Sequence, residues 1–255
     1  MDSVLEKFSV FDFFNLICTG AVFLIGLQFM GIRVHTFFAY LCSIDISKEN
    51  NFISLVFYLA VILGVCYVVG SCMQELGAFL QKKIFRIQEN AISSFLNNPN
   101  TIRNEVKRQV YIEEAKKLFK KKGIHIKGNK FTEEQCNYFF AYCVYYIQVR
   151  EHHKKTEKMR ELHGISNMLS TCFAILPIIG VVIHLINAYF IDFEFVENIS
   201  FTQIIIFICV FIFLATVFWF RMKKNILYRI RMVLGIFEAS IDKDLKRDEQ
   251  NRCIP

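Results

Sequence analysis

Four long apolar runs alternate with polar segments along this chain. They cover residues 11–32, 52–72, 168–190 and 202–220, and none has a lysine or arginine in its interior. A helix needs about 20 apolar residues to cross a hydrocarbon core of about 30 Å, so each run is long enough to form a transmembrane helix. The pattern therefore predicts an all-α protein with four transmembrane helices.

The segments outside these runs also keep apolar residues at helical spacing. Residues 74–97 extend the second run until Asn-Asn-Pro-Asn at 97–100 interrupts it, and residues 101–121 form an amphipathic helix that ends at Gly123. Thr132 and Gln135 form a capping box, and no strong break precedes Pro177. We therefore expect one helix over 132–191, with Gly164 as its weak point, and a helical extension of the fourth run beyond Arg221.

Basic residues gather in two of the segments outside the runs. The segment between the second and third runs has 18 Lys and Arg against 10 acidic residues, and nine more basic residues follow from Arg221. The loops at 33–51 and 192–200 have two and none. Because basic segments stay in the cytoplasm, both termini and the central segment are predicted to be cytoplasmic, where their helices form a bundle.

This topology divides the chain into four segments. Residues 1–73 hold the first two transmembrane helices and an outward loop, and residues 74–166 form a cytoplasmic helical segment. Residues 167–221 hold the third and fourth transmembrane helices, and residues 222–255 form a cytoplasmic C-terminal helix and tail.

Composition agrees with a membrane protein. The 255 residues are 54% hydrophobic and include 28 Phe but only three Pro, which is too apolar for an ordinary soluble domain. The formal net charge of +7 comes from basic residues that flank the membrane, where they anchor helices to anionic lipid. The same residues are candidates for binding an anionic ligand: Lys120, Lys121, Lys122, Lys154, Lys155, Arg221, Lys223, Lys224, Arg229 and Arg231.

Motifs of the common enzymes are missing from the sequence. It contains neither phosphate-binding glycine pattern, GxxxxGK[ST] or GxGxxG, and neither HExxH nor GxSxG. Its histidines and cysteines lack the spacing of a zinc site. We expect no enzyme activity, no cofactor and no metal site.

Two membrane runs carry small residues suited to close helix contact. In the first run Asn15, Thr19 and Gly20 lie close together, and in the second Gly64 and Gly70 lie toward the cytoplasmic end. Helices in lipid pack through such residues because their backbones can approach closely. We expect these positions to lie in helix–helix contacts.

The third run carries its small and polar residues on one stripe. At 100° per residue, Ser170, Pro177, Gly180, His184 and Asn187 fall on one side, and the opposite side, expected to face lipid, holds Cys172, Ile175, Ile179, Val182 and Ile186. Polar groups at membrane depth face either another helix or water. The five stripe residues are therefore candidates to line a pore, and packing against a neighbouring helix is the alternative.

Two short stretches resemble small bacterial membrane effectors of anti-phage defence. These stretches are FDFFNLICTG at 11–20 and SNMLSTCF at 166–173, and the four-helix plan is similar to the Hailong-type channel-forming subunit and to the accessory membrane proteins of type VI-B CRISPR systems. Such proteins often have Pro-Gly in the first helix, where this chain has Thr19-Gly20. The resemblance implies a homo-oligomeric pore in the inner membrane, controlled by a cytoplasmic protein or an oligonucleotide-like ligand.

The sequence thus supports two functional hypotheses. The first is an oligomeric gated ion channel in the lipid bilayer of the bacterial inner membrane, lined by the third helix and held shut by the cytoplasmic bundle. The second is a non-conducting membrane scaffold that recruits a cytoplasmic partner through residues 74–166. The scaffold hypothesis predicts that the polar stripe is buried between helices of one subunit.

Overall fold

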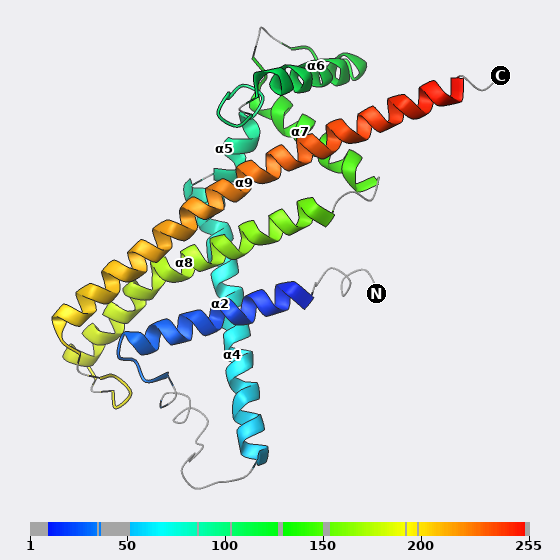
Figure 1. Cartoon of the computed structure of the whole chain (residues 1–255). Coiled ribbons are helices and arrows are strands. Elements are labelled where there is room, and N and C mark those ends of the chain that lie inside the picture. Colours follow the sequence, from blue (N-terminus) through cyan, green and yellow to red (C-terminus); the bar gives the residue numbers. More distant parts are fainter. Residues whose placement is uncertain are drawn as a thin grey trace. The chain divides into compact units, whose positions relative to one another are not determined.

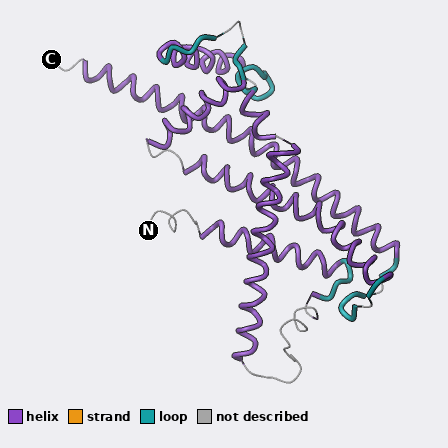
Figure 2. Tube along the Cα trace, turned by 180° about the vertical axis from the view of Figure 1, so that it is seen from behind, coloured by secondary structure: helices purple, strands orange, loops and turns teal. Residues whose placement is uncertain are grey.

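Helices make up most of the described part of the chain (Figure 1). A computed structural model describes residues 10–34, 36, 52–85, 87–102, 104–126, 130–149, 154–191, 193–197 and 199–252. The elements are α2 (Val10–Phe29), α4 (Phe52–Phe79), the π-helix η1 (Leu80–Phe85), α5 (Ile87–Ser93), α6 (Glu105–Lys121), α7 (Glu133–Val149), α8 (Lys154–Tyr189) and α9 (Phe201–Arg252). Figure 2 shows no strand in this described part, and the all-α prediction is confirmed.

Three helices are long and apolar enough to cross a membrane. Their apolar stretches lie within Val56–Lys83, Thr156–Tyr189 and Phe201–Asp242, and α2 adds a shorter apolar helix, Phe13–Phe29. These three helices correspond to the second, third and fourth predicted runs. They have the length and composition of helices in a membrane protein.

The chain forms two compact units, each assembled from separate parts of the sequence. Unit 1 holds residues 1–80 and 164–221, and unit 2 holds residues 81–163 and 222–255. Both α8 and α9 therefore contribute residues to each unit.

In unit 1, α2 and α4 cross at a pair of glycines. A Cβ atom on Gly20 would collide with the backbone of Cys66, and one on Gly70 would collide with the backbone of Leu16. Thr19 is buried at the same level, with 1% of its surface exposed. The predicted close contact is confirmed for these residues, whereas Gly64 has open space around it.

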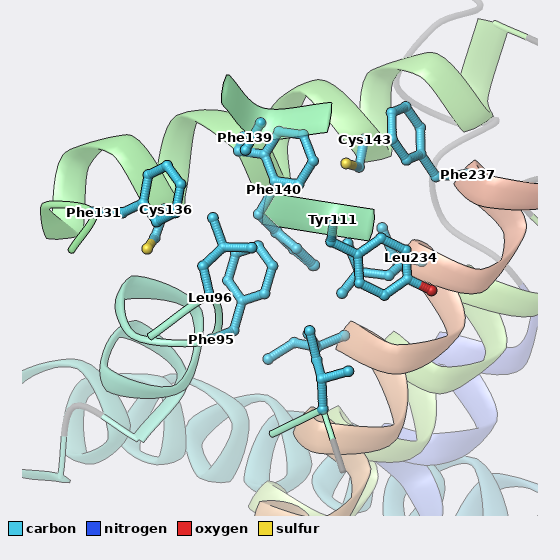
Figure 3. Packing of buried hydrophobic residues seen from close by; sticks show 14 of the residues in the cluster. Phe95, Leu96, Tyr111, Phe131, Cys136, Phe139, Phe140, Cys143, Leu234 and Phe237 are labelled. Carbon is cyan, nitrogen blue, oxygen red and sulfur yellow. The ribbon is translucent and has the colours of Figure 1, made fainter. Parts of the chain in front are cut away.

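Unit 2 encloses an aromatic core (Figure 3). Phe95, which follows α5, is fully buried, and its ring stacks on Phe139 of α7 at 6.3 Å. Phe237 of α9 meets Phe139 edge to face at 6.0 Å. Segments that are far apart in the sequence therefore share one core in unit 2.

Helix limits in unit 2 follow local chemistry. The backbone NH of Thr132 donates to Oε1 of Gln135 at 2.9 Å, and the backbone NH of Gln135 donates to Oγ1 of Thr132 at 3.2 Å, so the predicted capping box is confirmed at the start of α7. After α6, Gly123 adopts a φ of +68°, the left-handed conformation that ends many helices.

Within residues 132–191, over which one helix was predicted, the structure describes α7 and α8, and the prediction that they are continuous falls on residues 150–153, which lie outside the described part. One expectation for the third run itself is wrong. Cys172 was expected to face lipid but is fully buried, because it packs in the apolar cluster of unit 1.

Candidate functional site

The predicted polar stripe of α8 lies against other parts of unit 1. Near its start, the hydroxyl of Ser170 donates to the carbonyl oxygen of Ala215 in α9 at 3.0 Å. One turn or more further along, Pro177 is buried, and the surface of Gly180 is covered by the side chain of Met30. Small residues on this stripe therefore allow close packing within one subunit.

At the far end of the stripe, the side chains of His184 and Asn187 both have hydrogen-bond partners in unit 1. Nε2 of His184 lies 2.6 Å from the carbonyl oxygen of Met30, just after α2. Since a carbonyl only accepts, Nε2 carries the proton in this contact. The backbone NH of Phe193 donates to Oδ1 of Asn187 at 2.7 Å.

Residues 31–33, which follow the Met30 carbonyl that His184 contacts, are held in place by hydrogen bonds to residues 195–197. The backbone NH of Arg33 donates to the carbonyl of Phe195 at 2.8 Å, and that of Glu197 donates to the carbonyl of Gly31 at 2.8 Å. Nε of Arg33 also pairs with Oε1 of Glu197 at 2.6 Å. Gly31 adopts a φ of +77°, which glycine accommodates without strain.

In the part of α8 that belongs to unit 1, the face that remains open is apolar. Ile178, Val182 and Leu185 expose 63%, 47% and 50% of their surface, and they lie away from the stripe. In this arrangement the accessible side of α8 suits lipid or another apolar helix rather than an aqueous path. All five candidate pore-lining residues meet protein groups of their own chain or are buried.

Two sets of basic candidates in unit 2, at the end of α6 and at Arg231, have different surroundings. The end of α6 has three exposed lysines, Lys120, Lys121 and Lys122. Positive charge at this end stabilises the helix, because it interacts favourably with the helix dipole. Arg231 instead holds a turn, because its Nε donates to the carbonyl of Thr101 at 2.6 Å and its Nη2 to that of Asn100 at 3.1 Å. The side chains of Lys154 and Lys155 lie outside the described part.

The remaining basic candidates lie along α9. Arg221 and Lys224 are exposed, and Nζ of Lys224 lies 5.6 Å from the centre of the Tyr228 ring. Lys223 is half-buried. Arg229 differs from all of these, because its Nε is buried and has no hydrogen-bond partner in the described part of the chain.

A buried polar pair in unit 2 was not predicted as a site. His163 exposes 7% of its surface, and its Nε2 lies 2.9 Å from Nε2 of Gln81 in η1. Its Nδ1 lies 3.4 Å from the carbonyl oxygen of Met222. Since 82 residues separate the paired side chains, no local pattern of the sequence relates Gln81 to His163.

Comparisons with known proteins give no relative for this chain. No protein-family model matches it, and neither a curated protein nor a solved structure matches. Among the described residues, no group of three His, Cys, Asp or Glu side chains is placed to hold a metal ion.

Proposed function

We propose that this protein is a non-conducting membrane scaffold, in which unit 1 is the anchor and unit 2 recruits a cytoplasmic partner. One observation carries this proposal: the small and polar residues of the α8 stripe contact other groups of the same subunit. Ser170, His184 and Asn187 each have a hydrogen-bond partner in their own chain, and Gly180 packs against Met30. An anchor needs such internal contacts and no aqueous path.

The proposed anchor has four transmembrane helices, with α2 as the first. The 20 residues of α2 span about 30 Å at the helical rise, which is the thickness of the hydrocarbon core. Exposed apolar side chains such as Phe201, Ile206 and Phe213 suit contact with lipid along α9. The basic residues of 73–167 and of the segment after Arg221 support a cytoplasmic position for unit 2 and both termini.

Unit 2 offers α6 as a surface for a partner. Val106 and Val110 expose 74% and 38% of their surface, and the exposed lysines at 120–122 follow on the same helix. Apolar side chains near the start of α6 and positive charge at its end, about 15 Å further along the helix, suit a cytoplasmic protein that offers one apolar and one acidic contact.

Thiol accessibility at Ser170 tests the scaffold proposal directly. In Ser170→Cys, a membrane-impermeant maleimide should label position 170 no faster than background, because this side chain faces Ala215. Ser200→Cys, at an exposed loop position, is the positive control. Mass spectrometry of the labelled peptides separates both positions from the native cysteines. Rapid labelling at 170 in the reconstituted protein would refute the proposal.

A gated, homo-oligomeric pore is the second candidate, and Pro177 is the observation that favours it. Proline has no backbone NH, so the carbonyl of Phe173 lacks its helical donor and α8 can bend or turn there. Turning the stripe toward an oligomer axis would break the hydrogen bonds that Ser170 and His184 form with other segments. At about 0.6 kcal/mol each in membranes, the cost is about 1 kcal/mol, which a ligand can supply.

The pore candidate keeps the setting that the resemblance implies, an effector of anti-phage defence in the bacterial inner membrane. Its control would come from a cytoplasmic protein or an oligonucleotide-like ligand. Planar-bilayer recordings of the purified protein test it: single-channel currents that change in Asn187→Ala support a pore. A silent bilayer for both proteins, together with protection at Ser170→Cys, supports the scaffold.

A further inference from the structure

One helix of unit 2, α7, carries no charge beyond its first turn. Residues 135–149 include no Asp, Glu, Lys or Arg. The inner face of the helix lies in the aromatic core, where Phe139 and Cys143 are fully buried (Figure 3). On the outer side, Tyr138, Tyr145 and Val149 expose 42%, 66% and 62% of their surface. A helix with apolar and aromatic side chains on both faces is usually covered on both, so this outer side calls for a covering surface.

The exposed side chains of α7 form one stripe. At 100° per residue, five of them fall within about 100° of the helix circumference. We call this set the outer stripe of α7: Tyr138, Ala141, Tyr145, Gln148 and Val149. The centres of protein interfaces are rich in Tyr and poor in charged residues, and the outer stripe has both properties. It therefore suits another protein surface better than water.

The outer stripe is nearly symmetric about its middle. Ala141 lies near the centre, three residues after Tyr138 and four residues before Tyr145. When two copies of α7 run antiparallel and cross at Ala141, Tyr138 of each copy lies close to Tyr145 of the other. The small side chain at the crossing lets the two helix axes approach closely. A two-fold interface needs such a self-complementary patch, because the same residues meet on both sides.

The two charged residues of α7 favour the antiparallel arrangement. Glu133 and Glu134 both lie in the first turn of the helix. A parallel pair would bring four carboxylates together, and like charges in an interface are costly. In the antiparallel pair, Glu134 of one copy lies opposite Gln148 of the other. The acidic ends are then about 21 Å apart at the helical rise, well beyond the screening length of about 8 Å at physiological salt.

We propose that the outer stripe of α7 binds the same stripe of a second copy of this chain, as an antiparallel helix pair. One helix face is smaller than a standard protein interface, so the pair is weak between free molecules. Confinement of both copies to one bilayer raises their effective concentration, and this step rests on the proposed membrane anchor. The pairing does not depend on whether unit 1 conducts ions, and it uses a different helix from the partner surface proposed on α6.

Photo-crosslinking from the outer stripe tests the identity of the partner. Benzoylphenylalanine takes the exposed position of Tyr145 in the full-length chain, which cells make with two different affinity tags, and the exposed position of Lys116 in α6 is the matched control. Irradiation of the isolated membranes should yield a product that carries both tags and has twice the mass of one chain. Its crosslinked peptide should contain Tyr138 of the second copy. A crosslink to a different protein alone, no product, an equal product from position 116, or attachment near position 145 would overturn the antiparallel pair.

Complementary charges test which residues face each other. Tyr138→Glu and Tyr145→Lys each place a charge in the stripe at an exposed position, so the Tm of each variant should stay close to that of the wild type. Pull-down between differently tagged copies of one variant should fall about tenfold, because the contact desolvates the new charge. Co-expression of Tyr138→Glu with Tyr145→Lys should restore it, because the antiparallel pair sets the two charges opposite each other. Undiminished pull-down of both variants, or no recovery in the mixture, would overturn the pairing. Either result leaves the labelling of Ser170→Cys unchanged, so the pairing and the scaffold proposal are tested separately.

Discussion

The crossing of α2 and α4 gives the sharpest test of how unit 1 is packed. In Gly20→Ala, the new Cβ would lie 2.5 Å from the carbonyl carbon of Cys66 and 2.7 Å from its Cα. Carbon atoms pack best at about 3.5–4.0 Å, so the two helices must separate by about 1 Å. A gap of that size removes roughly a quarter to a half of the dispersion energy of the contacts that it opens.

The expected cost follows from two opposing effects. Forcing extra atoms into a packed contact costs about 1–3 kcal/mol, and replacing glycine inside a helix gains about 0.5–1 kcal/mol. Gly20→Ala should therefore lower the free energy of unfolding by up to about 2.5 kcal/mol relative to the wild type, and by about 1–3 kcal/mol relative to a variant that has the helical gain alone. Gly64→Ala is the matched control, because its Cβ would meet no atom within 4 Å and only the helical gain remains.

Titration of bicelle-reconstituted protein with sodium dodecyl sulfate, followed by circular dichroism, measures these differences. The double variant Gly20→Ala/Gly70→Ala should lose less than the sum of the single changes, since helices that have separated for one methyl group also make room for the other. If Gly20→Ala proved as stable as Gly64→Ala, the close crossing of α2 and α4 would be refuted.

Three further predictions concern unit 2. Thr132→Ala should lower stability by about 1 kcal/mol through loss of the capping box, whereas Thr132→Ser should retain it, as read by chemical denaturation. Phe95→Ala should cost about 3–5 kcal/mol, because the ring is fully buried in the core, and urea titration should show an earlier transition. Burial and the hydrogen bond to Glu238 raise the pKa of Tyr111, so the free energy of unfolding should fall as pH rises above about 10, where the unfolded chain ionises. Denaturation curves of Tyr111→Phe should lack this alkaline loss, and identical pH profiles for the two proteins would contradict it.

Local rules predicted the helices of this protein because their causes lie within a few residues. The long apolar runs became α4, α8 and α9, and the hydrogen bonds of Thr132 and Gln135 begin α7 as their three-residue spacing indicates. Gly123 ended α6 for the same local reason, its left-handed φ. The spacing of apolar residues after position 74 predicted that the helix continues, but it did not indicate that residues 80–85 form a π-helix, η1.

The candidate site could be predicted only in part, because its contacts join distant residues. Periodicity gathered Ser170, Pro177, Gly180, His184 and Asn187 on one side of α8. It contained no information on which group each would meet: the partner of His184 lies 154 residues away, and that of Ser170 lies 45 residues away. A stripe that packs on helices and one that faces water have the same spacing, and only the tertiary contacts distinguish them.

Unit 2 is assembled from two separate segments of the chain, and this affects when it can fold during synthesis. Residues 81–163 emerge from the ribosome first, but their core is completed by Ile230, Leu234 and Phe237, which follow two long apolar helical stretches. At about 5–20 residues per second, the 74 residues from 163 to 237 take roughly 4–15 s to synthesise. During that interval Phe95 and Phe139 lack part of their apolar cover, so a nascent chain that stalls before residue 222 should be a substrate for chaperones or quality-control proteases.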